Sequence, residues 1–331
     1  MTTSIRKTSR GPGVRRGVRA VSAVAAVAAL GGALTACGGQ SLEDKGGDGG
    51  KGGGKGTLVI GSAGFPESEV LAQIYARALA DAGYKTSVKT LTNRELYEPA
   101  LEKGQIDVVP EYLSTLADFL NAKANGADAA SVASHDADAA AKALEKLAAP
   151  RGLKVLPHGS ATDQNSFAVA RDFADKHHLK TLSDLGKSGL KIKIAAGEEC
   201  ETRPFCAPGL KKTYGVDITG IDPKGVGTIP AKQAVKNGTD QLVLTTTTDA
   251  TLKDFALVAL KDDKGLQNAD NVVPVVNAKS AGSKDVAAAL AKVTKTLTTA
   301  DLTELNKKVA QRQKPVDVAR TYLEDKGLAS K

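Results

Sequence analysis

The sequence predicts an α/β protein made of two similar blocks. Short apolar segments alternate with segments whose apolar residues recur at helical spacing, and glycine or proline marks many of the boundaries. A second series of the same kind begins at Asp163, and after it the chain returns to the first block. We therefore expect residues 57–161 and 267–331 to form lobe 1, residues 162–266 to form lobe 2, and a cleft to lie between them.

The first block opens with a strand, a turn of small residues and a helix. Leu58 to Ile60 is apolar, the turn 61–64 follows, and Pro66 suits the first turn of a helix that Gly83 ends. The turn matches neither a dinucleotide-binding nor a P-loop pattern, so a nucleotide site is not expected. The remaining expected elements of this block are a strand at 87–91, a helix at 94–103, a strand at 106–109, a helix at 136–149 and a strand at 153–156.

The second block and the C-terminal part follow the same alternation. Leu190, Ile192 and Ile194 alternate with lysines, which is typical of a half-buried strand. The other elements that we expect in these parts are strands at 167–170, 241–245, 256–260 and 272–276, and helices at 182–185, 208–214, 230–235, 285–297, 302–309 and 316–326.

One stretch of the first block is a candidate ligand contact. The strand 106–109 stops at Pro110 and delivers Glu111, Tyr112, Ser114 and Thr115 to a loop that starts the next helix. Ligands of open α/β sheets lie beyond the carboxyl ends of strands, at helix N-termini. Thr246 to Asp249 follow a strand of the second block in the same way. The alternative is an ordinary connection whose tyrosine packs on the core.

The N-terminus reads as a lipoprotein signal peptide over residues 1–36. A basic stretch precedes an apolar run, residues 20–30, that is too short to span a bilayer. Leu34-Thr35-Ala36-Cys37 resembles a lipobox, in which the cysteine is lipidated. A cleaved signal with an incidental cysteine and a short anchor are the alternatives. Residues 37–56 are rich in glycine, lysine and aspartate and predict a flexible tether, so the body is expected to be anchored at the outer face of a membrane.

Charge argues against a nucleic-acid partner. The chain carries a net charge of +8, but residues 1–36 hold six basic residues and no acidic one. The remaining chain has 39 basic and 37 acidic residues, which is close to neutral. A polyanion partner is therefore not expected.

The cysteines and histidines predict neither a metal site nor an enzyme. Cys200 and Cys206 are the cysteines that remain after Cys37, and outside the cytoplasm such an isolated pair is most simply a disulfide that closes a small loop. Their spacing does not match zinc knuckles. The four histidines are scattered, and Glu198-Glu199 reads as solvated charge rather than as paired catalytic acids. We expect no catalytic residue, no metal and no cofactor.

Several motifs point to a known family. Gly61-Ser62 with Phe65–Ser68 resembles the first-strand motif of the substrate-binding lipoproteins of osmoprotectant ABC importers, which bind glycine betaine, choline, carnitine and proline betaine. Pro110–Thr115 is similar to the PEYTGT motif of that family. Asn165–Val169 is similar to its NTYAL strand, and Thr248-Asp249 to its STDG turn. Further similarities carry the match, in order, to about residue 328.

The resemblance implies a type II periplasmic-binding-protein fold, whose two lobes close on a ligand. It also implies a monomeric extracytoplasmic lipoprotein that hands a small solute to an ABC permease and its ATPase. A sensory or scaffold lipoprotein that retains the fold without transport is the alternative. The expected ligand-binding residues are Phe65, Ser68, Tyr112, Thr115, Asn165, Phe167, Lys232, Thr246, Thr248 and Asp249.

Two of these positions depart from the pattern of the family. Thr246, and Lys232 or a neighbour, stand where the resemblance places tyrosines of an aromatic cage for a quaternary ammonium. A lysine there would repel a cation by about 1–4 kcal/mol per close pair. Tyr112 and Phe167, with Phe65, would remain as walls. The sequence therefore predicts either a betaine- or choline-like cargo or a more polar solute held by hydroxyls; the threonines at 245–248 can also be read as a plain strand end.

Overall fold

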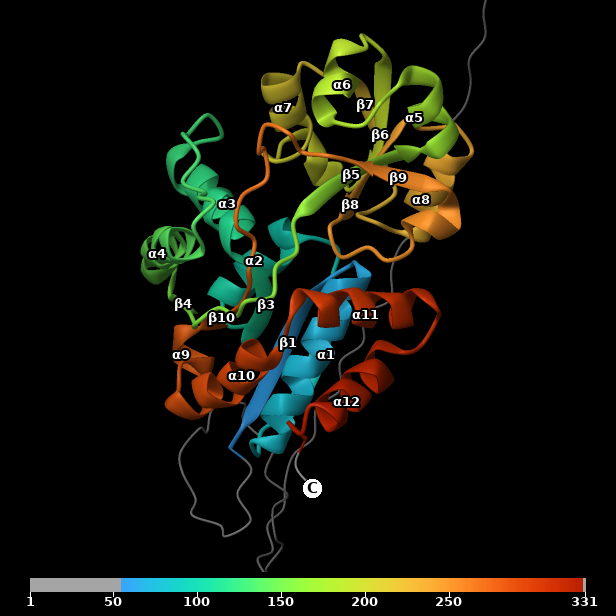
Figure 1. The fold of residues 1–331 in the computed structure, drawn as a ribbon. Helices are drawn as coiled ribbons and strands as arrows, with labels where there is room; N and C mark the ends of the chain where they lie inside the picture. Colours follow the sequence, from blue (N-terminus) through green and yellow to red (C-terminus); the bar gives the residue numbers. More distant parts are fainter. Residues whose placement is uncertain (1–54, 330–331) are drawn as a thin grey trace, which may run out of the picture. The chain divides into compact units, whose positions relative to one another are not determined.

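The fold is described by a computed structural model, which covers residues 55–329 (Figure 1). The expected signal peptide of residues 1–36, the lipidation site Cys37 and all but the last two residues of the tether 37–56 lie outside the described residues. Within residues 55–329, no helix is both long and apolar enough to span a membrane.

The first sheet has five strands in the order β2-β1-β3-β10-β4. β1 runs parallel to β2 and β3, whereas β10 is antiparallel to β3 and β4. β3 lies at the centre, and all five of its residues are buried. The strands are β1 (Thr57–Ala63), β2 (Lys85–Leu91), β3 (Val108–Tyr112), β4 (Leu153–Val155) and β10 (Val272–Asn277). We call this sheet with the helices packed on it lobe 1.

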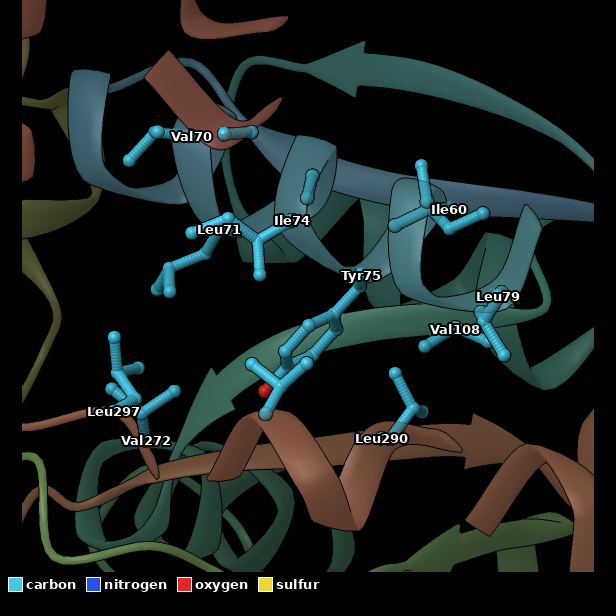
Figure 2. Close-up of a cluster of buried hydrophobic side chains, with 14 of the residues drawn as sticks. Ile60, Val70, Leu71, Ile74, Tyr75, Leu79, Val108, Val272, Leu290 and Leu297 are labelled. Atoms are coloured by element: carbon cyan, nitrogen blue, oxygen red, sulfur yellow. The ribbon is translucent and has the colours of Figure 1, made fainter. Parts of the chain in front are cut away.

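Each face of this sheet is covered by its own helices. Val108 of β3 packs in a cluster with α1, α10, α11 and α12, and the next residue, Val109, packs in a second cluster with α2, α3 and α4. Figure 2 shows the first cluster, in which the ring of Tyr75 lies among Leu290 and other apolar side chains. The helices are α1 (Pro66–Asp81), α2 (Arg94–Glu102), α3 (Leu113–Asn125), α4 (Ala137–Ala148), α9 (Ala278–Ala281), α10 (Lys284–Thr296), α11 (Thr299–Ala310) and α12 (Pro315–Asp325).

The second sheet has five strands in the order β7-β6-β8-β5-β9, and we call it, with its helices, lobe 2. β6 runs parallel to β7 and β8, and β5 is antiparallel to β8 and β9. The strands are β5 (Asn165–Ala170), β6 (Lys191–Ala196), β7 (Asp217–Pro223), β8 (Leu242–Thr246) and β9 (Leu257–Leu260). The helices are α5 (Arg171–His177), α6 (Leu182–Lys187), the single turn α7 (Ala207–Gly209) and α8 (Ile229–Lys236).

Two connections join the sheets, one from β4 to β5 and one from β9 to β10 (Figure 1). They run antiparallel to each other and are hydrogen-bonded. Thr162 and Asn271 form a β-bridge, and the amide of Asp163 donates to the carbonyl oxygen of Asp270 at 3.0 Å. Each crossing strand is therefore held by its neighbour where the chain passes between the lobes.

The structure differs from the sequence-based predictions at several helices and strands. The strand that we expected to stop at Pro110 continues to Tyr112, and Pro110 faces Pro274 of β10 in the register. Two facing prolines fit a ladder only at a pair that needs no N–H from either strand. β7 and α5 were not expected. β7 contains Gly220 and ends at Pro223, and neither residue is typical of a strand.

Candidate ligand-binding pocket

A pocket of about 840 Å³ is lined by residues of both lobes. Its walls come from the ends of β1 and β3, the first turn of α2, α3, both connections between the sheets, and the loop that follows β6. Five aromatic side chains of the described part of the chain line it, namely Phe65, Tyr97, Tyr112, Phe119 and Phe205.

Tyr112 ends β3 and is the N-cap residue of α3, so strand and helix together fix its backbone. Its ring lies 6.4 Å from the ring of Phe65, centroid to centroid. Its hydroxyl donates a hydrogen bond to Glu67 Oε1 at 2.7 Å, and the side chain is 9% exposed. The ring is thus held at the pocket by a polar contact at its far end, as buried tyrosines require.

The side chain of Glu67, in lobe 1, is hydrogen-bonded to a residue of lobe 2. It lies in the first turn of α1, where a negative charge is favourable. Thr248 of lobe 2 donates to Glu67 Oε2 at 2.7 Å, and Asn306 of α11 donates to the same oxygen at 2.6 Å and to Thr248 Oγ1 at 2.9 Å. The buried carboxyl group therefore connects Tyr112 to a residue of the other lobe.

Arg94, which lines the pocket, forms a buried ion pair with Glu111. The Arg94 guanidinium donates to both carboxylate oxygens of Glu111, at 2.9 and 2.7 Å, and to Thr115 Oγ1 at 3.1 Å. The hydroxyl of Tyr97 donates to Glu111 Oε1 at 2.6 Å. Burial, and then the charge of Glu111, raise the pKa of Tyr97 well above its usual value, so its hydroxyl stays protonated as a donor.

Asp270, on the connection to β10, caps α3. Its Oδ1 accepts hydrogen bonds from the amides of Ser114 at 2.8 Å and Thr115 at 3.0 Å. Side-chain acceptors at this place satisfy the unpaired amides of a helix N-terminus. Burial raises the pKa of Asp270 to about 7, although both amides and Arg94 act in the opposite direction.

Asp163, on the other connection, faces a second carboxyl group. Its Oδ1 accepts hydrogen bonds from Thr247 Oγ1 at 3.0 Å and from the amide of Thr248 at 3.1 Å. Burial and the neighbouring charge of Glu67 raise the pKa of Asp163 well above its usual value. Asp163 is therefore harder to ionise than an exposed aspartate.

The loop after β6 is closed by a disulfide between Cys200 and Cys206, whose Cα atoms are 5.1 Å apart. The loop brings Phe205 to the pocket. It also brings Arg203 to Glu95 of α2 in lobe 1, with two hydrogen bonds of 3.2 and 2.8 Å. The loop therefore supplies one aromatic wall and an ion pair between the lobes. Among the described residues, no cluster of histidine, cysteine and acidic side chains could hold a metal ion.

Comparison with known proteins identifies the family. Residues 56–325 match the family described as the substrate-binding domain of ABC-type glycine betaine transport systems. The chain belongs to this family. Its members bind a transported solute rather than convert it, and substrate-binding proteins of ABC importers work outside the cytoplasm. The family that the sequence motifs predicted is confirmed.

Individual relatives agree with this assignment. The chain is 28% identical over 283 residues to the glycine-betaine-binding protein of Pseudomonas aeruginosa, covering 82% of this chain and 88% of that protein. It is 27% identical over 222 residues to the carnitine transport binding protein OpuCC of Listeria monocytogenes, covering 63% and 67%. A crystal structure of a glycine betaine/carnitine/choline ABC transporter protein superposes with a TM-score of 0.60 at 19% identity, over 82% of this chain and 99% of that one. The fold is that of type II periplasmic binding proteins, as the sequence predicted.

The pocket brings together six of the ten residues that the family resemblance indicated. Each of these six contributes to the lining, and they come from both lobes: Phe65, Ser68, Tyr112, Thr115, Asn165 and Thr246. Ser68 also accepts the amide hydrogen of Ala63 at 2.8 Å and so fixes the turn after β1. The other four are not among the lining residues: Phe167, Lys232, Thr248 and Asp249.

These four side chains are occupied elsewhere. Phe167 is 1% exposed and packs in the core of lobe 2. Lys232 donates to Asp249 Oδ2 at 2.9 Å and to Thr251 Oγ1, so its charge is neutralised within lobe 2. Burial acts to raise the pKa of Asp249, but Lys232 and neighbouring hydroxyls lower it overall. Thr248 is fully buried against Glu67.

Sequence reasoning missed five lining residues that matter here: Tyr97, Phe119, Phe205, Asp163 and Asp270. The three aromatics give the pocket more aromatic walls than the sequence indicated. Phe205 had a usable signal, because it is an apolar residue inside a short disulfide-closed loop. The two aspartates lie on connections whose pairing depends on the fold, and nothing local marks them.

Proposed function

We propose that this chain is the solute-binding lipoprotein of an ABC importer, and that its cargo is a small ammonium solute of the betaine or choline type. It would deliver the solute as a monomer to a permease driven by an ATPase. The observation that carries the proposal is the pocket between the lobes, whose lining combines aromatic faces with polar groups. Aromatic faces attract a desolvated cation and pack against its methyl groups.

The position of Lys232 supports a cationic cargo. The sequence placed this lysine at a cage position, where it would repel an ammonium group. In the structure it is 4% exposed, is paired with Asp249 and does not line the pocket. Lys232 therefore gives no reason to prefer a more polar solute over a betaine- or choline-like one.

Calorimetric titration tests the proposal with the full-length protein in mild detergent, against glycine betaine, choline and carnitine. At least one should bind. Tyr112→Ala removes a wall of the pocket and should weaken that binding by about 1–3 kcal/mol, roughly 5- to 150-fold. Tyr84→Ala is a matched control in lobe 1, because Tyr84 does not line the pocket. Absence of binding by all three solutes, or equal affinities of the Tyr112 and Tyr84 variants, would count against the proposal.

The lipid anchor is the second part of the proposal, supported by the lipobox-like residues 34–37 and by the glycine-rich segment that follows. Cells expressing the protein should incorporate a clickable palmitate analogue into it. Cys37→Ser should remove that label, since the thiol that accepts the diacylglyceryl group is gone. Cys200→Ser is the control and should keep the label. Labelling that survives Cys37→Ser would refute the assignment of this anchor.

A further inference from the structure

The positive charges that line the pocket are all engaged. Arg94, Lys123 and Arg203 are the basic side chains of the lining in the described part of the chain. Arg94 is paired with Glu111, Arg203 with Glu95, and Lys123 with Glu98 and Glu102. A ligand carboxylate would have to compete with one of these protein carboxylates for its cation.

Four acidic side chains of the lining, within residues 55–329, lack such a partner: Asp118, Asp163, Glu198 and Asp270. Glu198 is exposed to solvent, and Asp118 accepts hydrogen bonds from Ser131, Val132 and Ala133 of the segment that follows α3. Asp163 and Asp270 are 4% and 3% exposed, and both line the pocket. Their hydrogen-bond donors are backbone amides and one hydroxyl, and neither forms an ion pair with a lysine or arginine within residues 55–329. Because the amide of Asp163 donates to the carbonyl of Asp270, the two residues lie side by side on the paired connections.

The surroundings of these two groups leave them short of positive charge. Asp163 faces Glu67 of α1 and the hydroxyl-bearing residues Thr247 and Thr248; the hydroxyl of Tyr112 and the amide of Asn306 reach Glu67 rather than Asp163. Asp270 faces the amides that open α3, with Arg94 and its partner Glu111 further away. An ammonium group in the pocket would supply the missing positive charge.

We propose, building on the binding function above, that Asp163 and Asp270 make this pocket select a solute of net positive charge over a zwitterion. The preferred cargo is an ammonium compound without a carboxylate, and the two aspartates are specificity-determining residues. A zwitterion brings a carboxylate that would be buried near Asp163 and Asp270 without a free cationic partner, which is unfavourable. The aromatic walls accept the ammonium group of either ligand and therefore do not discriminate between them.

The same arrangement makes binding release protons. Burial and, for Asp163, the adjacent Glu67 hold the pKa values of both groups above the usual range, so the empty pocket retains protons in mildly acidic solution. A bound cation stabilises the carboxylates and displaces these protons. Affinity for a permanent cation should therefore rise with pH through about 7, the pKa of Asp270, as that group becomes ionised.

Calorimetric titration with choline and glycine betaine tests the inference. Choline is a cation, glycine betaine is a zwitterion, and neither changes its charge between about pH 5.5 and 8, so any pH dependence in this range belongs to the protein. The full-length protein should bind choline about tenfold or more tightly than glycine betaine, a difference of about 1.4 kcal/mol or more. Its choline affinity should fall several-fold at the lower pH.

Two aspartate variants test whether Asp163 and Asp270 cause the preference for choline and its pH dependence. Asp163→Asn and Asp270→Asn each keep an acceptor oxygen for the observed hydrogen bonds, remove the charge, and should weaken choline binding about tenfold with a smaller effect on glycine betaine. Asp128→Asn removes an exposed charge outside the pocket and should change neither affinity. Circular dichroism establishes that each variant is folded, and the ligand ratio and pH dependence of the unaltered protein test the inference without any variant.

The possible results distinguish a failure of the proposed charge selectivity from a failure of the proposed binding function. Glycine betaine binding as tight as choline binding, or a choline affinity that does not change with pH, would overturn the selection for net charge and leave the binding function standing. Binding of neither ligand nor carnitine would overturn the proposed function together with this inference.

Discussion

Glu111→Ala is expected to lower the free energy of unfolding by about 3–5 kcal/mol, because it leaves the Arg94 guanidinium buried without its partner. The side chains of Arg94 and Glu111 are 6% and 1% exposed, so water cannot replace the lost carboxylate. The variant also removes the acceptor of the Tyr97 hydroxyl. Urea-induced unfolding followed by circular dichroism measures the loss.

Glu95→Ala is the matched control for this variant. It also removes a glutamate that forms two hydrogen bonds with an arginine, but Glu95 and Arg203 are 38% and 28% exposed. Exposed pairs contribute about 0–1 kcal/mol, so the control should be only slightly destabilised. Equal losses for the two variants would mean that burial does not set the strength of the Arg94–Glu111 pair.

Much of the framework of lobe 1 could be predicted from the sequence. The helices α1, α10, α11 and α12 carry apolar residues at helical spacing, and proline or a capping residue begins each of them. These signals are local, and the structure keeps them because the same apolar residues are buried. Local signals also marked Tyr112 as a candidate ligand contact, and it lines the pocket, although it ends β3 rather than lying in the loop that we expected.

The polar part of the pocket could not be predicted in this way. Asp163 and Asp270 are more than a hundred residues apart and meet only because two connections pair between the sheets.

Lys232 is a residue that the sequence assigned to the pocket and that the structure places elsewhere. Its place in the sequence pointed to the pocket, but a buried lysine needs a counter-charge, and Asp249 lies within reach in its own lobe. A motif predicts which segments lie near the ligand, whereas the hydrogen-bond and ion-pair partners of a polar side chain determine whether it lines the pocket.

Phe167→Ala is expected to destabilise the protein by about 3–5 kcal/mol and to leave ligand affinity within about twofold of the unaltered protein. The sequence resemblance placed Phe167 at the ligand, but the structure places it in β5, between Leu244 of β8 and Leu260 of β9. At 1% exposure, its removal opens a cavity in the core of lobe 2. Urea unfolding measures the stability, and calorimetry with the tightest-binding solute, at a temperature where the variant is folded, measures the affinity.

Phe65→Ala should show the opposite pattern. Phe65 is only partly buried and lines the pocket beside Tyr112, so its removal should cost less stability and weaken the ligand by about 1–3 kcal/mol. The comparison separates the two roles because both changes remove the same ring, one from a sheet core and one from a pocket wall. A Phe167→Ala variant that keeps its stability and loses affinity as Phe65→Ala does would return Phe167 to the pocket wall. That result would mean that the family motif predicts the ligand contact better than the packing of β5.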